Sequence, residues 1–174
     1  ANIPYQISSP LIKKLTRHLK AQTNPIAHVV LMLQLEFAQR LSMNHPADIG
    51  SLGLTVALDW DVEEHHIVPP HHFSPQPAVQ SQVVGMKPHG REFPVDKRLL
   101  QQMIHHAFDQ RRKKIRSSMK KAPRRISRIK GWHAQRWKDA MQSLQDLDIM
   151  NARPEELTLE DWVDFAKKVE KGSK

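Results

Sequence analysis

Cysteine is absent from the 174-residue chain, and glycine is scarce, with six residues in all. Without cysteine, disulfide bonds and cysteine-ligated zinc are excluded, and the composition fits a reducing compartment without proving one. No two glycines stand as Gly-x-Gly, so these residues contain no glycine-rich loop of the kind that holds a nucleotide cofactor. No window is apolar enough to span a membrane, and no secretory or transit signal is visible. With 39% hydrophobic residues, we expect a soluble globular protein with no membrane partner.

Acidic residues are also scarce, but only in one part of the chain. Residues 95–138 contain fifteen Lys and Arg against two Asp and Glu, whereas the other residues contain twelve against sixteen. All of the net charge of +9 therefore originates in one segment. Such a concentration of cations predicts a nucleic-acid partner and strongly salt-dependent binding. The candidate RNA-binding residues are Arg111, Arg112, Lys113, Lys114, Arg116, Lys120, Lys121, Arg124 and Arg125.

Apolar residues in this basic segment recur at three- and four-residue spacing, which predicts one long helix with an apolar face. They are Leu100, Met103, Ile104, Ala107, Phe108, Ile115 and Met119. Lys113 and Lys120 would lie on the opposite face, flanked by Arg112 and Arg116. A basic amphipathic helix can also lie on a membrane surface. The helical patterns that follow favour burial in a protein core instead.

The rest of the pattern predicts an α/β protein followed by a small all-α domain. Expected helices cover residues 7–19 and 35–41, a fully buried strand of the parallel type covers 28–33, and further strands cover 52–58, 64–68 and 82–86. From Asp96 onward only helical signals remain, so we place domains at 1–92 and 93–174.

Three features support helices in the second domain. Asp96 is a candidate N-cap for the basic helix, and Trp137, Met141, Leu144 and Leu147 mark a second helix. Thr158 and Asp161 form a candidate capping box for a terminal helix. The apolar residues of that terminal helix are Trp162, Phe165 and Val169.

The first residues carry a pattern suited to methylation of an adenine amine, Asn2-Ile3-Pro4-Tyr5. That amine is a poor nucleophile, so its hydrogens need acceptors and the base needs a stacking surface. The Asn2 side-chain oxygen and the Ile3 carbonyl are candidate acceptors, and Pro4 holds the preceding residue extended. Tyr5 offers an aromatic face to a base turned out of its stack. Taken alone, the tetrapeptide is more typical of an ordinary turn before a helix.

Four segments together decide against a simple turn. Residues 2–11 read NIPYQISSPL, residues 73–81 read FSPQPAVQS, residues 107–119 read AFDQRRKKIRSSM, and residues 152–162 read ARPEELTLEDW. A proline-rich linker would explain the prolines near Phe73, but not an aromatic residue, a valine and a serine at those offsets. In order and spacing, the segments resemble the rRNA adenine dimethyltransferase family, which includes a mitochondrial transcription-factor-B-like branch. The resemblance covers only the carboxyl-terminal part of the family, from the Asn-Ile-Pro-Tyr motif onward.

The resemblance implies the carboxyl-terminal half of a Rossmann-like methyltransferase sheet, ending in an antiparallel hairpin, and a helical rRNA-binding domain. The implied activity is S-adenosyl-L-methionine-dependent dimethylation of adenosines near the 3′ end of small-subunit rRNA, coupled to small-subunit biogenesis. Asn2, Ile3, Pro4, Tyr5 and Phe73 would be the catalytic residues, with Phe73 as the second wall of the base pocket, and Asn2 and Pro4 would also touch the cofactor.

Partners implied by the resemblance are small-subunit rRNA and the immature small ribosomal subunit, with its proteins and other assembly factors. We expect a monomer outside that particle. The location is expected to be intracellular, with the mitochondrion, the nucleolus and the cytoplasm left open.

The family holds S-adenosylmethionine mainly through a glycine-rich loop and an acidic residue, and both would precede Ala1. We therefore expect that the native amino terminus lies upstream. Three explanations remain open: the chain is the ordered part of a longer protein, a shortened form of one, or an assembly factor whose cofactor half is dispensable or degenerate. In the family an aromatic residue often precedes the stretch GSLGLTV of residues 50–56, and this chain lacks it.

Specific residues bear on several alternative functions. A non-catalytic ribosome-assembly factor that binds immature rRNA has no reason to keep both Asn2 and Phe73. A DNA adenine methyltransferase usually has proline where Ile3 stands. Three adjacent histidine pairs, residues 65–66, 71–72 and 105–106, have poor geometry for chelating one ion, so no metal site is expected. Trp137 and Trp162 are expected in the core, and Trp132 is left open as a base-stacking residue.

Overall fold

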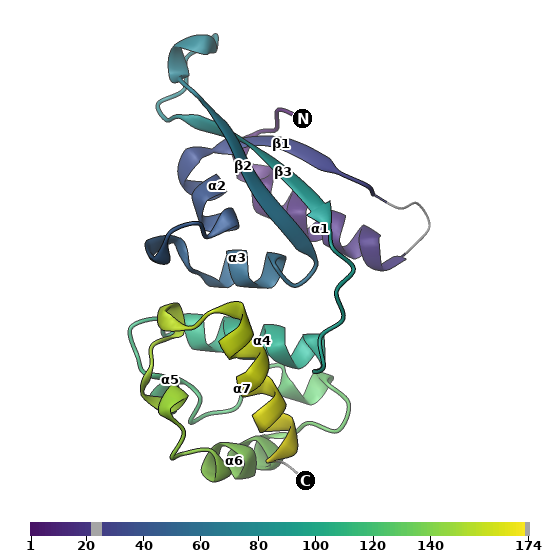
Figure 1. The fold of residues 1–174 in the computed structure, drawn as a ribbon, viewed down its shortest axis with the longest axis vertical. Coiled ribbons are helices and arrows are strands. Elements are labelled where there is room, and N and C mark those ends of the chain that lie inside the picture. The colour runs from purple at the N-terminus through teal and green to yellow at the C-terminus, as the bar shows by residue number, and fades with distance from the viewer. Residues whose placement is uncertain (22–25, 173–174) are drawn as a thin grey trace. The chain divides into compact units, whose positions relative to one another are not determined.

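The computed structural model describes residues 1–21 and 26–172. It forms two compact units, one of residues 1–48 and 56–91 and one of residues 49–55 and 92–174. Figure 1 shows the elements of each unit. The functional division into a methyltransferase domain at 1–92 and an rRNA-binding domain at 93–174 stays a prediction.

A sheet of three strands organises the first unit. Its strands are β1 (Val29–Gln34), β2 (Trp60–Val68) and β3 (Ser81–Pro88), in the order β1-β3-β2. Because β3 runs antiparallel to both neighbours, β1 and β2 point in the same direction. Asn2 pairs with Met32 in a parallel bridge, so the first residues line the free side of β1. The predicted α/β class and the antiparallel hairpin are confirmed.

Helices of the first unit follow the predicted pattern closely. They are η1 (Tyr5–Ile7), α1 (Ser8–Ala21), α2 (Leu35–Ser42), η2 (Pro46–Asp48) and η3 (Pro70–His72). The helices predicted at 7–19 and 35–41 are confirmed, and α2 packs against all three strands. The strand predicted at 82–86 is confirmed, and β2 begins earlier than the predicted residue 64.

The strand predicted at 28–33 exists as β1, but its expected complete burial is wrong. Leu31 and Leu33 are buried, whereas Val30 is 46% exposed. Side chains alternate between the two faces of a strand, and here only one face enters the core. A continuous apolar run therefore does not show how many faces of the strand are covered.

The strand predicted at 52–58 is wrong, because this segment contains α3 (Ser51–Val56). The Leu54 N–H donates to the Gly50 carbonyl at 3.0 Å, and the Thr55 hydroxyl donates to the Ser51 carbonyl at 2.6 Å. Short apolar runs fit a buried helix turn as well as a buried strand, and one polar residue, Thr55, is too few to separate the two periods in the run LGLTVAL.

The second unit is helical beyond residue 92, as predicted. It contains α4 (Lys97–Phe108), α5 (Ile115–Ser118), η4 (Ile126–Arg128), α6 (Ala134–Ser143), η5 (Asp148–Asn151), η6 (Pro154–Glu156) and α7 (Leu159–Lys171). The Asp96 carboxylate accepts from the backbone N–H groups of Arg98 and Leu99, which confirms the predicted N-cap. Thr158 and Asp161 form the predicted capping box of α7.

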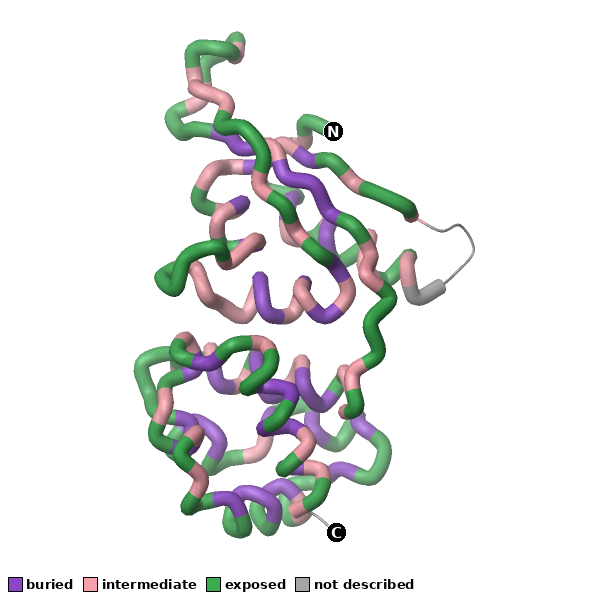
Figure 2. Tube along the Cα trace, viewed as in Figure 1, coloured by how far each residue is buried: buried purple, intermediate pink, exposed green. Residues whose placement is uncertain are grey.

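The single basic helix predicted across residues 100–119 is wrong. The chain leaves α4 after Phe108 and turns, with the Lys113 N–H donating to the Gln110 carbonyl at 2.8 Å. It re-enters the core at Ile115, whose N–H donates to the Ala152 carbonyl at 2.9 Å. The predicted apolar residues are buried except Phe108, which is half-buried, so the three- and four-residue spacing fits one helix or two. The cations at 111–114 lie on an exposed turn and not on a helix face (Figure 2).

Candidate functional site

Asn2 is positioned by pairing of the first residues with β1. The Met32 N–H donates to the Ala1 carbonyl at 2.9 Å, and the Ala1 nitrogen donates to the Val30 carbonyl at 2.6 Å. This pairing directs the residues after Asn2 beyond the carboxyl end of β1. In α/β sheets, ligands bind outside the carboxyl ends of the parallel strands.

The two predicted amine acceptors have no competing partners. Within residues 1–21 and 26–172, no hydrogen bond reaches the Asn2 carboxamide or the Ile3 carbonyl. The next carbonyl, that of Pro4, accepts instead from the Ile7 N–H at 3.1 Å and starts the helical turn η1. Asn2 is also exposed. The acceptors of Asn2 and Ile3 are therefore available to a ligand.

Tyr5 is fixed by a residue that was not assigned to the site from the sequence. The Tyr5 hydroxyl and the Ser81 hydroxyl lie 2.6 Å apart, and either can donate. Ser81 is the first residue of β3 and is fully buried. The signal that could have found it is its place as the last fixed position of FSPQPAVQS. This bond holds the phenol end of Tyr5 at the start of β3.

Phe73 lies in the loop that joins β2 to β3. Val68 pairs with Ser81 at the base of this loop, and the Leu35 N–H donates to the Gln80 carbonyl at 3.0 Å. The loop therefore leaves the sheet at the edge where Tyr5 meets Ser81, and it projects beyond the strands (Figure 1). No ring contact joins Tyr5 and Phe73 within the described residues. Their action as two walls around one base stays a prediction.

The predicted RNA-binding cations do not form one row. Arg111 is paired with Glu155, which partly neutralises it. Arg112, Lys113 and Lys114 are exposed on the turn between α4 and α5. Lys121 is exposed as well, and its carbonyl accepts from the His106 ring at 2.9 Å.

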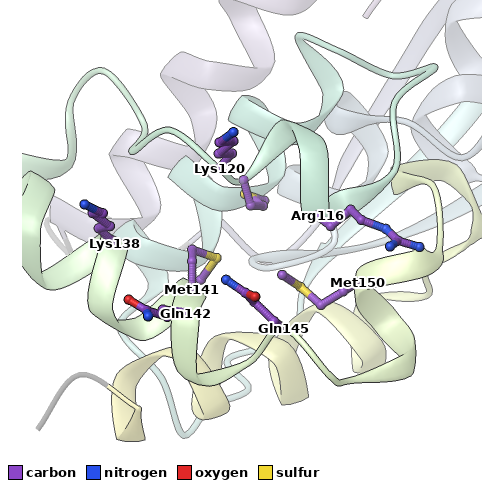
Figure 3. A pocket seen from close by; sticks show the side chains of 8 residues that line it. Arg116, Lys120, Lys138, Met141, Gln142, Gln145 and Met150 are labelled. Carbon is purple, nitrogen blue, oxygen red and sulfur yellow. The ribbon is translucent and has the colours of Figure 1, made fainter.

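The remaining predicted cations flank two different pockets of the second unit. Arg116 and Lys120 line a pocket of about 640 Å³ together with Lys138, a cation that was not among those predicted from the sequence (Figure 3). Arg124 and Arg125 line a smaller pocket of about 220 Å³. The cations thus form separate clusters on the helical unit.

The tryptophan left open by the sequence is a packing residue. Trp132 is 6% exposed, and its ring meets Trp137 edge-on at 6.2 Å between centroids. The Arg136 guanidinium covers Trp132 at 4.3 Å from the ring centroid. Stacking of Trp132 on a base is therefore excluded in this conformation. The predicted burial of Trp137 and Trp162 is confirmed.

Within the part of the chain that the structure describes, no three His, Asp or Glu side chains are placed to hold one ion. No described helix is long and apolar enough to cross a bilayer.

Comparison with known proteins agrees with this geometry. A family model described as Ribosomal RNA adenine dimethylase matches residues 1–142. Ribosomal RNA small subunit methyltransferase A of Paracidovorax citrulli is 33% identical over 167 residues, covering 95% of this chain and 58% of the relative. The protein of the same name from Prochlorococcus marinus is 34% identical over 173 residues, covering 96% of this chain and 56% of the relative. The chain thus spans little more than half the length of these curated relatives.

Solved structures give the same relationship. A dimethyladenosine transferase from Plasmodium falciparum superposes with a TM-score of 0.77 at 25% identity, covering 99% of this chain and 66% of that one. The 23S rRNA methyltransferase ErmE superposes with a TM-score of 0.57 at 20% identity, which supports the fold alone. The Rossmann-like fold predicted from the resemblance is confirmed. Because the family match includes both the Asn2–Tyr5 motif and the basic segment, the chain belongs to the ribosomal RNA adenine dimethylase family.

Proposed function

We propose that the protein containing this chain transfers two methyl groups to the exocyclic amine of adenosines in small-subunit rRNA, near its 3′ end. The observation that carries the proposal is the pair of free acceptors at Asn2 and Ile3, at the sheet edge where Tyr5 is fixed by Ser81. The names of the relatives support rRNA as the substrate. Dimethylation is supported by the similarity to the dimethyladenosine transferase from Plasmodium falciparum.

S-adenosyl-L-methionine is the methyl donor that family membership implies. The free carboxamide of Asn2 and the backbone at Pro4 fit the methyl end of such a donor, because both lie at the carboxyl edge of the sheet. No Gly-x-Gly occurs in the chain, so these residues are assigned no part in holding the rest of the cofactor. When bound, the cofactor would supply an electrophilic methyl group.

The residues of this chain would orient and activate the adenine. The Asn2 oxygen and the Ile3 carbonyl accept hydrogen bonds from the amine hydrogens, which raises the electron density on the nitrogen. Tyr5 and Phe73 hold the two faces of the base, and Ser81 keeps Tyr5 in place. No side-chain base is required, since the methylated amine is acidic enough to lose its proton to solvent or a carbonyl.

The helical unit would hold the rRNA through phosphate contacts. Its free cations include Arg112, Lys113 and Lys114 on the exposed turn and Arg116 on α5. We place the protein on the immature small ribosomal subunit, as a monomer before binding, inside the cell. Within this proposal, methylation accompanies small-subunit biogenesis.

Methyl transfer from labelled cofactor to immature small subunits tests the proposal, with the full-length protein. Asn2→Ala should lower the rate by roughly 100-fold or more, the usual effect of losing a preorganised polar contact to the reacting group. Asn44→Ala is the matched control, because Asn44 is an exposed asparagine of the same unit. The nucleoside product should be N6,N6-dimethyladenosine.

Two results would contradict the proposal. One is undiminished transfer by Asn2→Ala. The other is intact subunit maturation with Asn2→Ala but failed maturation when Arg112 and Arg116 are reversed in charge, which would favour a non-catalytic assembly factor.

A further inference from the structure

One pocket of the helical unit combines an apolar floor with a charged rim. Its volume of about 640 Å³ lies within the range of roughly 300–1,000 Å³ typical of small-molecule sites. Its lining comes from α5, α6, η5 and the turns that follow them. Figure 3 shows the side chains that line it, with Lys138 and Arg116 on opposite sides of Met141 and Gln145.

Three methionines form the floor of this pocket. Met119, Met141 and Met150 are 0%, 6% and 3% exposed, so their thioethers are held by the core beneath them. Methionine is polarizable and adapts its shape to flat aromatic rings, with favourable sulfur–ring contacts. The floor therefore suits a planar, weakly polar ligand.

The rim selects a negatively charged ligand. Within the described residues, Arg116, Lys120 and Lys138 form no ion pair. The side chains that line the pocket include no Asp or Glu. Phosphate groups would therefore contact cations that no carboxylate of the pocket lining neutralises.

Two amides also line the pocket. Gln142 and Gln145 are exposed, and no hydrogen bond within the described part of the chain involves their side chains. A carboxamide both donates and accepts, so it can pair with the edge of a nucleobase. An acidic peptide would use the cations but has no planar ring for the methionines.

We propose that this pocket binds one unpaired nucleotide of RNA. Its base lies on the methionine floor, its edge pairs with Gln142 or Gln145, and its phosphates contact Arg116, Lys120 and Lys138. The site shares no residue with the candidate adenine pocket. The proposal rests on the proposed function only in taking RNA as the partner, and it does not require methyl transfer.

Methyl signals of labelled methionine in the full-length protein test the site directly. Single Met→Leu variants, which nearly conserve volume, assign the signals of Met119, Met141 and Met150. Single-stranded RNA should shift these three signals. A fully paired duplex of the same sequence, and an abasic strand of the same length, should bind through the cations without shifting them.

Matched variants separate the amides from the charges. Combined Gln142→Ala and Gln145→Ala should weaken single-stranded binding roughly two- to tenfold per lost hydrogen bond and leave duplex binding unchanged. Gln135→Ala is the control, because Gln135 is an exposed residue of the same helix whose amide donates to Asp139 at 2.7 Å. Circular dichroism checks that all variants are folded.

The outcomes distinguish this proposal from the proposed function. RNA binding without movement of the three methionine signals overturns the nucleotide site and leaves the methyltransferase proposal standing. Equal shifts with poly-glutamate also overturn it, in favour of an acidic protein partner. Shifts with single-stranded RNA from a protein that transfers no methyl groups support the nucleotide site and contradict the proposed function.

Discussion

At the residue scale, the candidate adenine pocket depends on one hydrogen bond between distant parts of the chain. Tyr5 and Ser81 are joined at 2.6 Å although 76 residues separate them. Ser81 is fully buried, so a lost partner there is not replaced by water. The bond links the Asn2–Tyr5 motif to the Phe73 loop, which ends at Ser81.

A double-mutant cycle at Tyr5 and Ser81 tests that link. Tyr5→Phe keeps the aromatic face but leaves Ser81 without its partner, so we expect about 1–3 kcal/mol lower stability. Adding Ser81→Ala should cost less than the sum of the single effects, with a coupling of about 1 kcal/mol. Urea unfolding of the two single variants and the double variant measures the stability losses and the coupling between them. Strict additivity would show that the bond contributes nothing.

Neighbouring arginines should contribute unequally to RNA binding. Arg111 is paired with Glu155, whereas Arg112 has no ion pair among the described residues. Arg112→Ala should reduce the slope of log affinity against log salt by about 1, and Arg111→Ala by less. Filter binding at several salt concentrations measures the slopes. Equal slopes for the two variants would mean that the ion pair opens on binding.

Much of the candidate site could be predicted from the sequence, because its motifs are local. The Asn2–Tyr5 motif lies at the end of an extended segment, and Phe73 lies in a loop, as their neighbours indicate. The role of Ser81 and the separate clusters of Arg116 and Arg124 could not be predicted, since both depend on contacts between residues far apart in sequence.

At the scale of elements, the errors have one physical cause. A short apolar run does not distinguish a strand from a helix turn, as α3 demonstrates. Helical spacing does not reveal a break, as the turn between α4 and α5 demonstrates, because both helices face the same core. The predictions of helix caps were more reliable than those of element type. Asp96 and Thr158 satisfy backbone groups close to them in sequence, so their role does not depend on distant contacts.

The capping box of α7 should make a measurable contribution to stability. The Thr158 hydroxyl accepts from the Asp161 N–H at 3.2 Å, and the Asp161 carboxylate accepts from the Thr158 N–H at 2.9 Å. Thr158→Ala should cost about 1 kcal/mol in the free energy of unfolding, measured by urea titration.

Asp164 on the same helix provides the control. Lys167 holds the pKa of Asp164 below its ordinary value, first by a hydrogen bond and then by its charge. The Asp164 side chain is 67% exposed, so solvent screens the interaction and Asp164→Ala should change stability very little. An Asp164→Ala loss as large as that of Thr158→Ala would refute the special role of the cap.

At the scale of the whole molecule, the uneven charge makes a prediction about salt. The positive excess lies entirely in residues 95–138. Replacing Lys113, Lys114 and Lys120 by alanine should reduce the salt slope for single-stranded RNA by about 2, since each phosphate contact contributes roughly 0.7. The matched control replaces three exposed cations of α1, Lys13, Lys14 and Arg17, and should change the slope little. An equal reduction of the salt slope in the two triple variants would mean that RNA binding depends on the total charge and not on the position of the cations.

The most direct test of the central claim, a two-walled adenine pocket, is the single-turnover rate of methyl transfer in a series at Phe73. Phe73→Tyr should stay near the wild-type rate, and Phe73→Ala should fall by roughly 5- to 150-fold, which corresponds to about 1–3 kcal/mol of stacking on one base. Phe73→Leu, apolar but not aromatic, should lie between them. Wild-type rates for both Phe73→Leu and Phe73→Ala would contradict the claim that Phe73 holds the target base.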